Sequence, residues 1–226
     1  MKSYNRNKTL PEKLIRKQIL NPSEILVSTS WSHFLYIYNS IKSNIKPVGW
    51  ELETKTFHDP TLKSIKVPLK EHIYKPLPQK FKKSSIHDLT AYKIFKKYIL
   101  KNHYRFMHLG FGHTDTYAHY NNFTQYMNHF VLAEECILDL IKTTKMIDFY
   151  SQNTYFIITT DHGRGCGDVW TEHKHKIDGS ERAWAIIIGP HIKQNQCCHE
   201  EFCFVTINNL MERLIVDPKS LSNSIQ

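Results

Sequence analysis

Acidic residues and histidines gather in three short segments of the second half of the chain. Asp115 and His119 stand four residues apart, so on a helical turn both side chains project from one face. A carboxylate and an imidazole at that spacing can bind one divalent ion. Asp161 and His162 form a second pair, and His173 follows in the third segment. These residues predict a metal site, and mixed histidine and carboxylate ligands favour zinc or manganese over magnesium.

Each of the first two segments follows an apolar run that is typical of a buried strand. Strand-type runs lie at 24–29, 106–111, 155–160 and 183–188, and helix-type segments at 31–41, 84–101, 120–146 and 204–215. Strands that alternate with helices predict an α/β fold with a doubly wound, mostly parallel sheet and helices on both faces. Ligands collect at the carboxyl ends of strands in such sheets, and the first two segments occupy that position.

Two of the predicted helices carry apolar stripes that we expect to face the core. In the helix at 84–101 the stripe is Leu89, Tyr92, Phe95 and Ile99. In the helix at 120–146 it is Phe123, Tyr126, Met127, Phe130, Val131, Ile137, Leu138 and Ile141.

The composition fits one domain over residues 1–226. Of the 226 residues, 41% are hydrophobic and 23% are charged, which is enough for a sizeable core and excludes a disordered chain or a coiled coil. Between about 46 and 83, prolines stand among many lysines, which indicates an insertion at the surface. The longest apolar run, 183–188, is far shorter than the roughly 20 residues of a membrane-spanning helix.

The chain is basic, with a formal net charge of +9, and a basic chain raises the question of nucleic-acid binding. Its lysines are scattered through proline-containing sequence without an element that could read a groove. This pattern argues against nucleic acid and favours a solvated, lysine-rich surface. The N-terminus leads into charged sequence without an apolar stretch, so no secretory signal is expected and the encoded location is cytoplasmic.

The order of the motifs resembles the alkaline phosphatase superfamily, which includes phosphatases, phosphodiesterases and sulfatases. The likeness begins at about residue 8 and is strongest between 104 and 191. The motifs that carry it are Gly-Phe-Gly-His-Thr-Asp-Thr-Tyr-Ala-His at 110–119, Thr-Thr-Asp-His-Gly-Arg-Gly at 159–165, Trp-Thr-Glu-His at 170–173 and Gly-Ser-Glu-Arg-Ala-Trp at 179–184.

By this resemblance two divalent ions would bind in the complete family site, and at least one is expected here. Asp115, His119 and His173 would hold one ion, with His175 as the alternative to His173. Asp161 and His162 would contribute to the second ion. Arg164 would contact an oxygen of the substrate, or pair with Glu181 or another acid.

The chain departs from the family pattern at its start. Family members place a metal-binding Asp on the first strand and a Ser or Thr nucleophile soon after it. This chain resembles the carboxyl two-thirds of such an enzyme, so we expect a partial domain without the N-terminal strand and nucleophile segment, and no catalytic nucleophile is identified.

The resemblance implies hydrolysis of phosphate or sulfate mono- or diesters, with a small-molecule ester as substrate and with the activity impaired. The alternative is a non-catalytic metal-binding remnant, or a subunit that pairs with a separately encoded N-terminal fragment. Complete relatives are often periplasmic or secreted.

Overall fold

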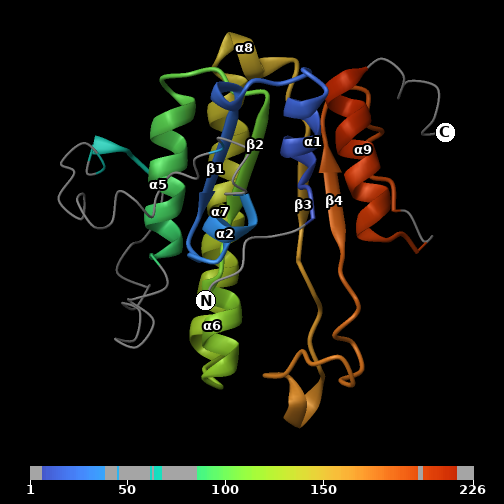
Figure 1. Ribbon diagram of the computed structural model, residues 1–226. Helices are drawn as coiled ribbons and strands as arrows, with labels where there is room; N and C mark the ends of the chain where they lie inside the picture. Colours follow the sequence, from blue (N-terminus) through green and yellow to red (C-terminus); the bar gives the residue numbers. More distant parts are fainter. Residues whose placement is uncertain are drawn as a thin grey trace.

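The computed structural model describes residues 7–38, 45, 62, 64–67, 86–197 and 201–217, without the side chains of 35 and 36 (Figure 1). The insertion predicted at 46–83 lies almost wholly outside these residues. The helices are α1 (Leu10–Arg16), α2 (Phe34–Tyr38), α5 (Asp88–Ile99), α6 (His113–His119), α7 (Phe123–Lys145), α8 (Asp148–Ser151) and α9 (Phe204–Val216). The strands are β1 (Ile25–Thr29), β2 (Phe106–Gly110), β3 (Phe156–Thr159) and β4 (Ala185–Ile188).

The strands form two pairs of opposite kind. β1 and β2 are parallel, with Ile25 opposite Phe106 and Thr29 opposite Gly110. β3 and β4 are antiparallel, with Phe156 opposite Ile188. The fold is therefore mixed α/β with a small parallel sheet, and the direction of β4 differs from the expectation of parallel strands.

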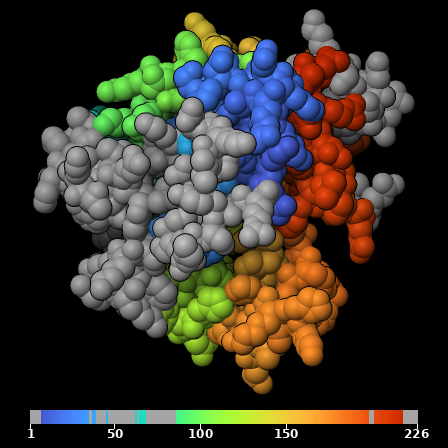
Figure 2. All heavy atoms as spheres, in the orientation of Figure 1, coloured from blue at the N-terminus to red at the C-terminus, as the bar shows by residue number. Residues whose placement is uncertain are grey.

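The connection between β3 and β4 agrees with the antiparallel direction of this pair. A parallel neighbour needs a crossover, usually through an α-helix. Residues 160–184 form loops and a single 3-10 turn at Gly167–Val169. The chain therefore returns along β3 in the opposite direction. The connection is not packed on the strands as a crossover helix would be, and it can contact α6 (Figure 2).

Helix α5 buries the stripe that its sequence predicts. Leu89, Tyr92, Phe95 and Ile99 are all buried, and they share one hydrophobic cluster with Leu26 of β1. β1 itself is buried at all five positions. The prediction for this helix is confirmed, and α5 packs directly on the parallel pair.

Helix α7 buries a different face from the predicted one. Its buried residues include Gln125, His129, Leu132, Cys136 and Leu140. The predicted stripe was wrong for five residues that are at least 40% exposed, namely Phe123, Met127, Phe130, Val131 and Leu138. A prediction from hydrophobic spacing assigns a histidine to the polar surface of a helix. His129 is buried nevertheless, because the carboxylate of Asp88 lies next to it inside the protein.

The carboxyl ends of β2 and β3 point toward the same end of the molecule. There α6 and the connection between β3 and β4 lie next to each other (Figures 1 and 2). In the space-filling view the orange atoms of this connection touch the yellow-green atoms of α6. The fold thus brings the motif after β2 next to the motif after β3.

Among the described residues, none of the helices has the length and apolar character that would let it cross a membrane.

Candidate metal centre

Helix α6 supplies the first two candidate ligands. It begins directly after Gly112, two residues beyond the end of β2, and is seven residues long. Asp115 and His119 lie one helical turn apart, with His119 Nε2 3.5 Å from Asp115 Oδ1. Both side chains are partly exposed to solvent, so an ion can reach them.

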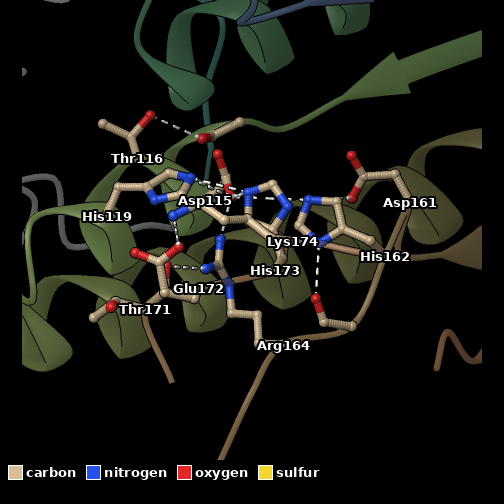
Figure 3. Close-up of polar contacts among 12 residues, drawn as sticks. Asp115, Thr116, His119, Asp161, His162, Arg164, Thr171, Glu172, His173 and Lys174 are labelled. Carbon is tan, nitrogen blue, oxygen red and sulfur yellow. Dashed lines mark hydrogen bonds and ion pairs between the residues drawn. The ribbon is translucent and has the colours of Figure 1, made fainter. Parts of the chain in front are cut away.

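His173, from the connection between β3 and β4, completes a triangle of ligand atoms (Figure 3). Its Nε2 atom lies 3.4 Å from Asp115 Oδ1 and 2.9 Å from His119 Nε2. A tetrahedral zinc ion with bonds near 2.0–2.1 Å holds its ligand atoms about 3.3–3.4 Å apart. The three atoms therefore have the donor types and almost the spacing that one such ion requires.

Backbone hydrogen bonds hold the loops that carry these side chains. The Gly163 amide donates to the Ser180 carbonyl at 2.9 Å, and the Gly165 amide donates to the Glu172 carbonyl at 3.0 Å. A Cβ atom on Gly163 would lie 2.0 Å from the Gly179 carbonyl oxygen, so only glycine permits this approach. The loop after β3 is thereby tied to the segment that presents His173.

His162 lies against His173 and not in a separate ligand group. The two rings stack with centroids 3.9 Å apart, and His162 Nε2 is 3.9 Å from Asp115 Oδ1. His162 Nδ1 is 2.8 Å from the Gly163 carbonyl, which accepts a hydrogen bond when this nitrogen is protonated. That bond leaves Nε2 with a lone pair for an ion.

Asp161 is at the margin of the site. Its side chain is 82% exposed, and its Oδ1 atom lies 3.7 Å from His162 Nε2. Figure 3 shows it beyond His162, away from His119. Within the described part of the chain, Asp161 and His162 do not join a third potential ligand to form a second group.

Arg164 forms an ion pair with Asp115, its Nη2 atom contacting the Oδ1 atom that faces the imidazoles. Its Nη1 atom donates to the Thr171 carbonyl at 3.1 Å. Arg164 is therefore paired with an acid, which was one of the two alternatives expected from the sequence. The acid is Asp115 and not Glu181. The guanidinium balances the carboxylate charge at the place where an ion would sit.

The surroundings keep His173 in the form that binds metal. Burial lowers the pKa of His173, the neighbouring His162 and Arg164 lower it further, and Asp115 opposes them. An imidazole must be neutral to bind a metal ion. The His173 imidazole therefore remains neutral, and able to bind an ion, at a lower pH than an ordinary histidine. His175, two residues away, is exposed.

The structure contains a second group of potential ligands that the sequence motifs did not predict. Asp88, His113 and His129 are buried together, with ligand atoms within 4.8 Å of one another. Asp88 is the first residue of α5, and His129 stands in the buried stripe of α7. The local signals were weak: His113 stands in the motif at 110–119, and Asp88 is an acid at a helix start, which is also the ordinary place for a capping residue.

Comparison of the chain with protein-family models, with curated proteins and with solved structures found no match.

Proposed function

We propose that this protein is a divalent-metal-dependent hydrolase of phosphate or sulfate esters with the doubly wound fold of the alkaline phosphatase superfamily. The observation that carries the proposal is the triangle of Asp115 Oδ1, His119 Nε2 and His173 Nε2, with sides of 2.9–3.5 Å. The motif order supports the superfamily. The position of the triangle beyond β2 and β3 is where such folds bind ligands.

A zinc or manganese ion held by Asp115, His119 and His173 would polarise the ester and stabilise the charge that develops on its oxygens. Arg164 would turn from Asp115 toward an oxygen of the bound ester once the ion neutralises the carboxylate. His162 would orient His173 through its stacked ring, and with Asp161 would contribute to a second ion.

Metal binding gives the direct test. The purified chain, loaded with zinc or manganese and freed of excess ion, should retain about one ion per chain by elemental analysis. His173→Ala should lose the ion, because one of the three ligand atoms of the triangle disappears. His175→Ala is the matched control, since this exposed histidine lies two residues away, and it should bind like the wild type. Equal metal content in both variants would contradict the proposal.

Activity tests the second half of the proposal. Hydrolysis of nitrophenyl phosphate, a nitrophenyl phosphodiester and a nitrophenyl sulfate should be slow, because no nucleophile is assigned among the described residues. Whatever turnover occurs should vanish with chelator and in Asp115→Asn. Turnover that survives both changes would refute this mechanism.

A non-catalytic metal-binding subunit is the second candidate function. The observation that favours it is the exposure of β4, where Ile186 and Ile188 are 50% and 40% exposed although the strand is wholly apolar. A separately encoded segment could cover these side chains. Tight metal binding with no turnover on any ester, together with turnover after addition of such a segment, would establish this candidate.

A further inference from the structure

One buried carboxylate joins three helices next to the metal centre. Asp88 begins α5, and its Oδ1 atom accepts a hydrogen bond from the Gly112 amide at 3.0 Å. Its Oδ2 atom accepts one from the His113 amide at 3.2 Å. The backbone at the start of α6 is thus attached to Asp88 through two successive amides.

Two imidazoles complete the surroundings of this carboxylate. His113 Nδ1, from α6, lies 2.5 Å from Asp88 Oδ1, and His129 Nδ1, from α7, lies 3.3 Å from Oδ2. All three side chains are at most 2% exposed. Burial acts to raise the pKa of Asp88, but the two histidines outweigh it and hold that pKa well below its usual value, so the carboxylate is charged.

Helix α6 depends on such contacts for its place. A helix of seven residues is not stable by itself in water, so its neighbours must define its position. The Gly112 amide, which donates to Asp88, also donates to Ser30 Oγ at 2.8 Å. Asp115 follows Gly112 by three residues, so a shift at the start of α6 moves Asp115 and His119 together.

We propose that Asp88 is a positioning residue that fixes α6, and through it Asp115 and His119, in the geometry that the metal centre requires. For its metal-binding part this inference rests on the proposed function. Preorganised ligands depend on supporting contacts behind them, and the loss of such contacts weakens metal binding without removing a ligand.

The same residue types could instead form a buried metal site. Against this, each oxygen of Asp88 already accepts one backbone N–H and faces one imidazole. A buried carboxylate with four such neighbours is satisfied without an ion. The buried metal site is therefore kept as an outcome of the test.

The test compares Asp88→Asn with Tyr150→Phe. The first change keeps the size of the side chain and removes its charge. The second removes a buried hydroxyl that accepts from the Tyr104 amide and donates to the Asn102 carbonyl, away from α6. Both variants should melt at lower temperature than the wild type. Zinc affinity by chelator competition, and amide hydrogen exchange of residues 112–119, are measured well below the melting temperatures.

Asp88→Asn should weaken zinc binding by about tenfold or more and speed exchange at Gly112 and His113, whereas Tyr150→Phe should change neither. Equal behaviour of the two variants in both measurements would overturn the inference. If the wild type binds no zinc, the proposed function fails, and the exchange comparison alone decides whether Asp88 holds α6.

Two further results are decisive. Zinc that remains in His173→Ala but is lost in Asp88→Asn would overturn the inference in favour of a buried metal site. If Asp88→Asn does not fold, Asp88→Glu takes its place, because it keeps the charge but shifts the carboxylate oxygens away from the Gly112 and His113 amides. This variant should weaken zinc binding by a smaller factor, and unchanged affinity and exchange would overturn the inference.

Discussion

Replacement of Gly163 by alanine should disturb the metal centre without touching a ligand. The added Cβ would lie 2.0 Å from the Gly179 carbonyl oxygen and 2.3 Å from the Arg182 carbonyl oxygen. Ordinary contact begins at 3.4 Å, so the two backbone segments must separate by roughly 1 Å or more. Overpacking of this kind costs about 1–3 kcal/mol of unfolding free energy.

The displacement should also reach the ligands. The loop of Gly163 continues into Gly165, whose amide is bonded to the Glu172 carbonyl next to His173. A shift of that size in the support of a metal site lowers affinity by about 10- to 100-fold. Gly163→Ala should therefore lose both stability and zinc affinity.

Gly167→Ala is the matched control within the same connection. Gly167 has a φ of +58°, and no atom lies within 4 Å of the position of its Cβ. This change adds backbone strain of about 1 kcal/mol and no collision, so zinc affinity should equal that of the wild type. Chelator competition and urea unfolding measure both quantities. Wild-type affinity in Gly163→Ala, or equal losses in the two variants, would refute the reasoning.

Three further predictions concern charge and packing. Arg164→Gln should raise zinc affinity by about tenfold, because it removes a cation from the oxygen of Asp115 that faces the ion; a fall in chelator competition would contradict this. Phe130→Gln, on the exposed face of α7, should change the unfolding free energy by less than about 0.5 kcal/mol. Leu132→Ala, at a buried position of the same helix, should lower it by about 2–5 kcal/mol. Urea unfolding that gave the opposite order would mean that the face predicted from the sequence is the buried one. The folded-state pKa of Asp88 is depressed, so the charged carboxylate should stabilise the protein fully above about pH 4 and progressively less as the pH falls toward the folded-state pKa. The melting temperatures of the wild type and of Asp88→Asn should therefore converge below about pH 4. A constant difference between them would show that the charge of Asp88 does not stabilise the protein.

The sequence by itself determined which side chains could form a metal centre. Strand-type runs ended just before the motifs of Asp115 and Asp161, and the structure contains strands at 106–110 and 156–159. The spacing of Asp115 and His119 predicted one helical face, and both lie on α6. These features depend on residues a few positions apart, which is the range over which local periodicity carries information.

The resemblance named Asp115, His119 and His173 as one ligand set, but only the tertiary structure decided how the candidate residues meet. It placed His173 and not His175 beside His119, set His162 against His173, and left Asp161 exposed at the margin. It also made β4 antiparallel and buried a face of α7 that differs from the predicted one. The reason is physical: a buried polar residue is stable only with a partner, and the partner of His129 is Asp88, 41 residues away along the chain. Spacing within one helix cannot reveal a contact of that kind.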